Sequence, residues 1–278
     1  MIINGKEVAL RISNKLKKEI KSLNEKLTLC VIEIGENEAS KIYINQKEKK
    51  CNELGINFKL IKFNENELES NIEKEIINLN RDSNITGIII QLPVSNKYNI
   101  NKLINLIDPN KDVDGLTNEN KIKLLNEEKG LIPCTPLGII ELLKVYNIKV
   151  KGKSISIIGR SDLVSKPLFH MLLNMDATVT MCHSKTKNLK SFTKNADILI
   201  SATGKPHIIK KDMVKDNSII IDVGISRVNN ILYGDVDFNN VKDKVKYITP
   251  VPGGVGPMTI IMLMKNVLEA YKKQKNSK

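Results

Sequence analysis

The sequence predicts an α/β protein of two domains. Its 278 residues exceed the length of one typical domain. Short apolar runs, typical of buried strands, alternate along it with amphipathic stretches at helical spacing. This alternation predicts βαβ units and a mostly parallel sheet. The pattern breaks around Pro133 and Pro136, where a second series begins. We therefore expect one α/β series on each side of this break.

The first series has three expected helices and three expected strands. Residues 40–54 read as a helix that runs from a candidate N-cap, Ser40, to a candidate stop at Gly55. The run 85–92 is almost wholly apolar and ends before Pro93, as expected for a buried parallel strand. The expected helices are residues 8–23, 40–54 and 68–79, and the expected strands are residues 27–34, 57–63 and 85–92.

The second series repeats the same alternation. Its expected helices are residues 137–146 and 167–173, and its expected strands are residues 154–158, 177–182, 198–201 and 219–223. A helix over residues 259–271 and a lysine-rich tail close the sequence. We expect this last helix to pack back on the first domain.

The net charge of +13 is the unusual feature of the composition. A basic surface is one way to attract nucleic acid or a membrane. However, only four of the 44 basic residues are arginines, and there are five Phe, six Tyr and no Trp. Readers of phosphates and bases rely on arginine and on aromatic stacking. Lysine on solvated faces is the favoured explanation, and a basic nucleic-acid-binding protein stays as a remote alternative.

The cysteines and the apolar runs limit metal sites and location. Cys30, Cys51, Cys134 and Cys182 lie far apart and form no CxxC pair, so we expect no metal site. So few cysteines fit a reducing compartment. The first residues show no secretory leader, and no apolar run approaches the length that spans a membrane. We expect a cytoplasmic protein with no membrane partner.

A candidate phosphate-binding turn follows the expected strand 154–158. Gly159, Arg160 and Ser161 stand between this strand and a helix, whose free N–H groups would face a pyrophosphate. The next strand does not end in the acidic residue that would hold the ribose of NAD. Its end offers hydroxyls and a cation instead, among them Ser184 and Lys185. These groups suit a 2′-phosphate, so NADP is favoured over NAD, although Lys185 would also fit a solvated turn.

A second candidate cofactor contact follows the expected strand 219–223. There the segment 222–225 reads Asp-Val-Gly-Ile. Its small residue would let a nicotinamide ring approach the main chain. The same segment could equally be an ordinary buried strand end.

Candidate acid–base groups lie in the first series. Tyr43 and Lys47 are four residues apart and share one helix face. A lysine in a partly closed pocket can have a lowered pKa and act as acid or base, although most such pairs are solvated. Gln91 ends an apolar strand, where α/β folds place their ligands. Asp112 and Asp114 could cap their own turn or hold the edge of an amidine-like ring.

The segment 250–259 combines three prolines and three glycines before a helix. Proline makes the main chain rigid, and glycine permits its close approach to a ligand. The helix start adds free N–H groups. We therefore favour a ligand-contacting loop over a plain connection.

Taken together and in order, seven motifs resemble the bifunctional methylenetetrahydrofolate dehydrogenase/methenyltetrahydrofolate cyclohydrolase family over nearly the whole chain. The motifs are Ser40-x-x-Tyr43-x-x-x-Lys47, Gln91-Leu92-Pro93, Lys111-Asp112-Val113-Asp114-Gly115, Cys134-Thr135-Pro136, Gly159-Arg160-Ser161, Cys182-His183-Ser184-Lys185-Thr186 and the segment 250–259. The resemblance implies NADP-dependent oxidation of methylenetetrahydrofolate to methenyltetrahydrofolate and its hydrolysis to formyltetrahydrofolate. It also implies one-carbon metabolism that serves purine biosynthesis.

The resemblance further implies the domain plan. Residues 1–134, completed by the helix 258–278, would form a catalytic folate domain. Residues 135–257 would form a Rossmann-type NADP domain, with a folate cleft between the two. The family is usually a homodimer. A further hypothesis is that the lysine excess attracts folates that carry polyglutamate tails.

Roles follow from the resemblance residue by residue. Lys47 would move protons, Gln91 would hold and tune it, Tyr43 would position it and stack on the folate, and Asp114 would bind the pterin edge. The cofactor residues would be Gly159, Arg160, Ser161 and Ser184, with Ile225 near the nicotinamide. The folate-binding residues would be Tyr43, Lys47, Ile90, Gln91, Leu92, Asp114, Pro252, Gly253, Gly254, Pro257 and Thr259.

The sequence departs from the family pattern at a few positions. Ser165 stands where the family has glycine, which is expected to crowd the helix after the phosphate turn. Ile122 replaces a second glycine, and Val94-Ser95 replaces Leu-Pro. None of these changes touches Lys47, Gln91 or Asp114, so both activities are expected. The alternatives are a cyclohydrolase with weak or lost dehydrogenase activity and a reductase similar to shikimate dehydrogenase.

Overall fold

The computed structural model describes residues 1–229 and 231–276. The chain divides into two compact units, one made of Met1–Leu10 and Thr135–Thr259, the other of Arg11–Cys134 and the chain from Ile260 on. The division after Cys134 coincides with the break expected from the sequence. The first ten residues join the unit of Thr135–Thr259 through main-chain hydrogen bonds: Ile3 N donates to Ile248 O at 2.8 Å, and Lys6 N donates to Gly253 O at 3.1 Å.

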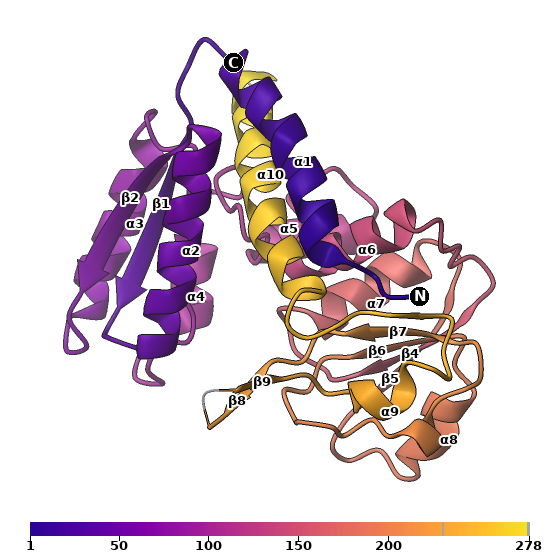
Figure 1. The fold of residues 1–278 in the computed structure, drawn as a ribbon. Coiled ribbons are helices and arrows are strands. Elements are labelled where there is room, and N and C mark those ends of the chain that lie inside the picture. Colours follow the sequence, from indigo (N-terminus) through magenta and orange to yellow (C-terminus); the bar gives the residue numbers. More distant parts are fainter. Residues whose placement is uncertain (230, 277–278) are drawn as a thin grey trace. The chain divides into compact units, whose positions relative to one another are not determined.

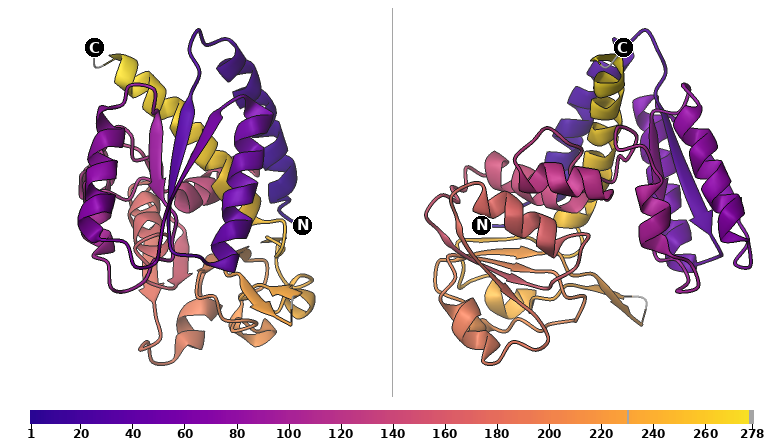
Figure 2. Two further views of the ribbon diagram at one scale, coloured as in Figure 1. Left: turned by 90° about the vertical axis from the view of Figure 1, so that its left-hand side faces the viewer. Right: turned by 180° about the vertical axis from the view of Figure 1, so that it is seen from behind.

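The unit of Arg11–Cys134 is built on a three-stranded parallel sheet in the order β2–β1–β3. Figures 1 and 2 show this sheet between α2 on one face and α3 on the other. Its elements are β1 (Thr28–Ile34), α2 (Glu38–Leu54), β2 (Asn57–Phe63), α3 (Glu69–Arg81), β3 (Gly87–Ile90), α4 (Ile100–Asn105) and α5 (Asn118–Leu125). The main part of α1 (Gly5–Lys21) and of α10 (Val255–Asn276) also belongs to this unit.

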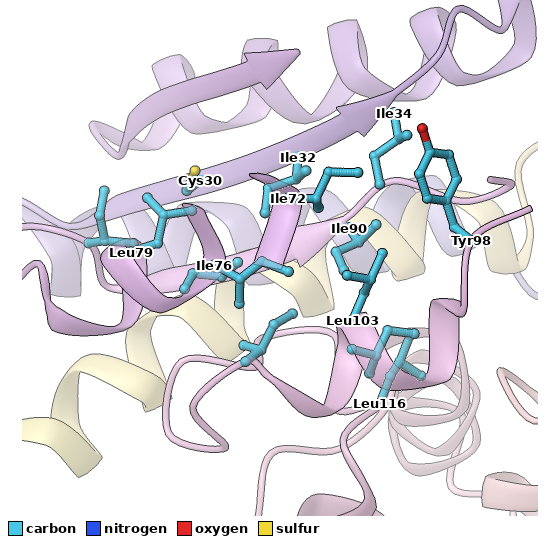
Figure 3. Packing of buried hydrophobic residues seen from close by; sticks show 14 residues of the cluster. Cys30, Ile32, Ile34, Ile72, Ile76, Leu79, Ile90, Tyr98, Leu103 and Leu116 are labelled. Carbon is cyan, nitrogen blue, oxygen red and sulfur yellow. The ribbon is translucent and has the colours of Figure 1, made fainter. Parts of the chain in front are cut away.

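An apolar core fixes β1 and β3 against α3. Ile72, Ile76 and Leu79 recur at helical spacing on α3 and pack on Ile32 and other residues of the strands (Figure 3). Burying one such side chain contributes about 1.5–3 kcal/mol. This core therefore sets the position of the carboxyl end of β3, where Gln91 follows.

The unit of Thr135–Thr259 contains a five-stranded parallel sheet in the order β10–β7–β6–β4–β5. Figure 1 shows α6 and α7 on one face and α8 and α9 on the other. Its elements are α6 (Cys134–Val145), β4 (Ser154–Ile158), α7 (Ser165–Leu173), β5 (Thr178–Cys182), α8 (Leu189–Lys194), β6 (Ile198–Ser201), η1 (Lys211–Met213), β7 (Ile219–Asp222), β8 (Ser226–Val228), β9 (Ile231–Tyr233), α9 (Phe238–Val241) and β10 (Tyr247–Ile248). The chain leaves β4 toward β5 and later returns to β6 on the other side, and such a switch of direction is where open α/β sheets bind ligands.

The two-domain α/β prediction is confirmed, and the strands expected at 57–63, 154–158 and 198–201 have those bounds. The prediction that the last helix starts at residue 259 is wrong, because α10 begins at Val255. Pro257 caused the error, because proline is tolerated in the first helical turn, where its missing N–H has no partner to lose. Among residues 1–229 and 231–276, no helix combines the length and the apolar character needed to cross a membrane.

Candidate functional site

The site in the unit of Arg11–Cys134 centres on Lys47, which α2 holds in a half-buried position. Its Nζ donates to Oε1 of Gln91 at 2.7 Å. Gln91 is itself fixed, because its Nε2 donates to Leu92 O at 2.6 Å and its main-chain N donates to Ile32 O at 2.8 Å. Tyr43 lies one turn before Lys47 and is 42% exposed. The structure therefore brings together the two residues that the sequence placed in different elements.

Burial and charge act in opposite directions on the ionisable groups here. Burial lowers the pKa of Lys47, while the nearby charge of Asp114 opposes this shift. Burial raises the pKa of Asp114, and the charge of Lys47 opposes that shift in turn. Because burial is the larger cause for both groups, the surroundings favour the neutral amine and the neutral acid. A lysine in this state can accept a proton from water.

The segment that carries Asp114 is held by its own side chains. Asp112 accepts hydrogen bonds from Leu116 N at 3.1 Å and Thr117 N at 2.8 Å, so this aspartate caps its own turn. Asn120 adds a third hydrogen bond to Asp112 at 2.9 Å. A Cβ at Gly115, whose φ is +68°, would lie 2.6 Å from the carbonyl carbon of Ile132. Asp112 therefore has the capping role and leaves Asp114 for the site.

Two further residues, to which the sequence assigned no role, hold this segment. Asn266 Nδ2 donates to Val113 O and to Ile132 O, both at 2.8 Å. The Sγ of Cys134 also donates to Val113 O, at 3.4 Å. Asn266 is a single buried polar residue in the apolar part of α10, which was the available signal.

The phosphate turn after β4 fits a dinucleotide. Gly159 has a φ of +131°, and a Cβ there would lie 2.6 Å from Ala202 O, so only glycine suits the position. Ser161 Oγ accepts from Val164 N at 3.2 Å and from Ser165 N at 3.4 Å at the start of α7. Arg160 and Ser161 are exposed. The turn thus combines a close main-chain approach, a helix start and an exposed cation.

Ser165, expected to crowd the turn, is fully buried at the first position of α7. Its Oγ would lie 2.8 Å from a Cβ at Gly159 and has no hydrogen-bond partner within the described residues. The missing side chain of Gly159 supplies room for the hydroxyl. Ile122, the other departure, is exposed on α5.

The remaining cofactor candidates lie at the carboxyl ends of the same sheet. Ser184 is exposed after β5, in a turn where His183 N donates to Thr186 Oγ1 at 2.9 Å. Ile225 follows β7 and is 42% exposed. No group of three or more His, Cys, Asp or Glu side chains suited to a metal ion occurs in the part of the chain that the structure describes.

The folate candidates fall in both units. Ile90 is buried at the end of β3, and Leu92 is half-buried. The proline- and glycine-rich segment is only partly a loop, because Pro257 and Thr259 belong to the first turns of α10. Pro252 and Gly253 lie in the turns before it.

Two contacts fix this segment within the unit of Thr135–Thr259. A Cβ at Gly254 would lie 2.6 Å from Pro250 O, which explains the glycine there. Thr259 Oγ1 lies 2.9 Å from Thr135 Oγ1. The start of α10 is therefore tied to the start of α6.

Comparisons with known proteins agree over nearly the whole chain. Residues 3–114 match the family model of the tetrahydrofolate dehydrogenase/cyclohydrolase catalytic domain, and residues 133–275 match that of the NAD(P)-binding domain. A bifunctional protein FolD from Hydrogenobaculum sp. is 46% identical, covering 98% of this chain and 99% of the relative. The FolD methylenetetrahydrofolate dehydrogenase/cyclohydrolase structure from Campylobacter jejuni is 41% identical, covers 99% of both chains and has a TM-score of 0.96. The Trypanosoma brucei methylenetetrahydrofolate dehydrogenase-cyclohydrolase, complexed with NADP cofactor and an inhibitor, is 31% identical with a TM-score of 0.94 over 99% of this chain and 98% of that one.

Proposed function

The chain belongs to the tetrahydrofolate dehydrogenase/cyclohydrolase family, and we propose that it oxidises methylenetetrahydrofolate with NADP and hydrolyses the methenyl product to formyltetrahydrofolate. The observation that carries the proposal is the 2.7 Å hydrogen bond between Lys47 Nζ and Gln91 Oε1. It holds a half-buried amine, with a pKa lowered by burial, in one orientation. Such an amine gives up its proton more readily than an ordinary lysine and is suited to proton transfer.

In the hydrolysis, Lys47 accepts a proton from the water that adds to the methenyl carbon. The new C–O bond leaves a tetrahedral carbon, and one carbon–nitrogen bond of the ring then breaks. Lys47 returns its proton to the departing ring nitrogen, and the second proton of the water is released to solvent. Gln91 keeps the amine in place through both transfers, and Tyr43 positions it and stacks on the folate.

In the oxidation, the bound NADP supplies the acceptor for the hydride of the methylene bridge. Gly159 would give the main chain its close approach to the cofactor, and Arg160, Ser161 and Ser184 would hold its phosphates. Ile225 would lie beside the nicotinamide. This step depends on alignment more than on acid–base help, because the folate nitrogens supply the electrons.

The proposed folate contacts come from three parts of the sequence. Asp114 binds the pterin edge, and Ile90 and Leu92 line the substrate beside Gln91. In the proline- and glycine-rich segment the contacts come from Pro252, Gly253, Gly254, Pro257 and Thr259. The lysine excess attracts the polyglutamate tails of the folate.

We propose a homodimer in the cytoplasm whose formyl product serves purine biosynthesis, with no nucleic-acid partner. Retention of DNA or RNA on a filter at moderate salt would contradict the absence of a nucleic-acid partner. Moderate salt already weakens binding that depends on a few phosphate contacts.

Separate assays of the two reactions test the function. Purified protein should hydrolyse added methenyltetrahydrofolate without NADP, and it should reduce NADP when given methylenetetrahydrofolate. Hydrolysis without NADP reduction, together with no NADP binding in a calorimetric titration, would instead support the cyclohydrolase alternative. If the protein consumes neither methenyltetrahydrofolate nor methylenetetrahydrofolate, the proposal is overturned.

A further inference from the structure

Two buried aspartates organise the carboxyl edge of the five-stranded sheet. Asp222 ends β7 and is 3% exposed, and Asp235 follows β9 and is 0% exposed. Within residues 1–229 and 231–276, neither carboxylate forms an ion pair. Burying an unpaired carboxylate costs free energy unless hydrogen bonds compensate. Packing alone therefore does not explain why two carboxylates are buried here.

The hydrogen bonds of Asp235 hold the loop that follows β6. Its Oδ2 accepts from Ser201 Oγ and from Thr203 N, both at 2.7 Å. Its Oδ1 accepts from Lys205 N at 2.9 Å. One carboxylate thus sets the main chain of the segment 201–205.

The hydrogen bonds of Asp222 hold the loop that follows β7 and also hold Asp235. Asp222 Oδ1 accepts from Gly224 N at 3.1 Å and from Asp235 N at 3.0 Å. Its Oδ2 accepts from Val236 N at 2.9 Å. Burial, with a smaller contribution from the charge of Asp235, raises the pKa of Asp222 to about 7, so these donors do not fully offset the cost.

The two aspartates are interlocked through two glycines. A Cβ at Gly224 would lie 1.9 Å from Asp235 Oδ1, and a Cβ at Gly234 would lie 2.1 Å from Asp222 Oδ2. Each carboxylate therefore occupies the space that a side chain on the opposite loop would need. The two aspartates therefore fix the loop 222–225 against the segment 234–236.

Asp235 and Asp222 thus hold the loops 201–205 and 222–225, and the second of these carries the candidate nicotinamide contact Ile225. Both loops follow neighbouring strands at the carboxyl edge of the sheet, where α/β folds bind ligands. Ser226 Oγ donates to Gly204 O at 2.6 Å, so the two loops are also joined directly. Both present exposed residues, Gly204 on one loop and Ile225 on the other.

We propose that Asp222 and Asp235 are positioning residues for NADP, which hold the loops 201–205 and 222–225 in their binding shape before the cofactor arrives. The inference rests on the proposed function and adds residues that touch no cofactor atom themselves. A shape set in advance saves the free energy of ordering these loops on binding. Loosening the pair should therefore weaken NADP binding more than it slows hydride transfer once NADP is bound.

The test compares NADP binding by calorimetric titration in the full chain and three variants. Asp235→Asn replaces one acceptor by a donor, and it should weaken NADP binding by about tenfold or more. Ser201→Ala removes a single hydrogen bond to Asp235 and is expected to weaken binding by about two- to fivefold. Asp237→Asn is the matched control, because this half-buried carboxylate accepts from Asn240 Nδ2 in the same segment and faces Lys210 Nζ at 3.8 Å, and none of its contacts is to the loops 201–205 and 222–225 among the described residues. The dissociation constant of NADP for this variant should stay within about twofold of the wild type.

Kinetics separate positioning from a loss of folded protein. Asp235→Asn should raise the KM for NADP and leave kcat at saturating NADP within about twofold, whereas partial unfolding would lower kcat alone. Hydrolysis of added methenyltetrahydrofolate, which needs no NADP, should remain unchanged. If Asp235→Asn does not fold, Ser201→Ala still carries the test. Wild-type affinity in both variants, or a lower kcat with an unchanged KM, would overturn the inference alone; failure of the wild-type chain to bind NADP would overturn the proposed dehydrogenase function and this inference with it.

Discussion

Lys47 Nζ and Gln91 Oε1 lie 2.7 Å apart, although the two residues are separated by 44 positions in the sequence. The helix α2 supplies the amine and the carboxyl end of β3 supplies the amide. Because the amide is also tied to Leu92 O, the amine has one preferred direction. This relationship gives the proposed hydrolysis its proton carrier.

Replacing Lys47 by methionine keeps the length of the side chain and removes the amine. Because water would lose its proton acceptor, hydrolysis of methenyltetrahydrofolate should fall by about 100-fold or more. The exposed neighbour Lys49, replaced by methionine, is the control and should retain full activity. NADP binding, measured by titration, should not change in either variant. Hydrolysis at more than half the wild-type rate in Lys47→Met would refute the role of this lysine.

The lowered pKa of Lys47 predicts a pH dependence with a definite sign. The rate of hydrolysis should rise with pH as the amine loses its proton, with a midpoint below the ordinary lysine value of 10.5. The free energy of unfolding should change with pH for the same reason. The contribution of Lys47 to stability is greatest above pH 10.5, and it is lost as the pH falls through the lowered pKa of this lysine.

Urea unfolding of the wild type and of Lys47→Met across this pH range checks the stability part. As the pH falls, the free energy of unfolding of the wild type should decrease relative to that of Lys47→Met. A pH-independent difference, or a rate that declines as pH rises toward this midpoint, would contradict the assignment.

Asn266 should matter for stability and for the segment that carries Asp114. Replacing it by leucine leaves the carbonyls of Val113 and Ile132 without their donor, which should cost about 1–3 kcal/mol in urea unfolding. The KM for methenyltetrahydrofolate should rise, because Asp114 follows Val113 directly. The same measurement on a second variant of α10 tells these effects apart.

Gln274 provides that control. Its Nε2 donates to two carbonyls, Thr86 O at 2.8 Å and Asn110 O at 3.0 Å, and neither belongs to the residue before Asp114. Gln274→Leu should therefore lose comparable stability with an unchanged KM. An equal rise in KM in both variants would show that Asn266 has no special relation to Asp114.

Ser165 carries a buried hydroxyl without a hydrogen-bond partner, so its removal should stabilise the protein. Ser165→Ala is expected to gain about 1 kcal/mol in thermal unfolding. Ser156 is the matched control, because its buried hydroxyl donates to Phe192 O at 3.0 Å and Ser156→Ala should lose stability. NADP affinity should stay within about threefold in Ser165→Ala, because Gly159 already leaves room for the hydroxyl. A tenfold gain in affinity would mean that Ser165 does crowd the phosphate turn.

The sequence predicted elements whose signal is local. The strand at 154–158 is an apolar run bounded by turn residues, and the helix α2 has a periodic pattern and a glycine stop, so neighbours in the chain decide both. The turn at Gly159 was found for the same reason. Short elements such as α9 and β10 were missed, because tertiary contacts rather than local pattern define them.

The relations between distant residues could not be predicted in this way. Asn266 lies 153 positions from Val113, and nothing in its own helix indicates which carbonyls it will meet. Asp222 and Asp235 are separated by a hairpin, and only the fold shows that each fills the space beside the other's glycine. Such contacts depend on where whole elements pack, which a single sequence does not encode as a pattern.

One progress curve tests the central claim most directly. Purified wild-type protein receives methylenetetrahydrofolate and NADP, and reduced cofactor and methenyltetrahydrofolate are recorded together. We expect reduced NADP to accumulate while the methenyl compound stays low, because Lys47 removes this compound as it forms. The same curve with Lys47→Met should show the methenyl compound rising together with reduced NADP. No reduction of NADP by the wild type, while added methenyltetrahydrofolate still disappears, would contradict the bifunctional account.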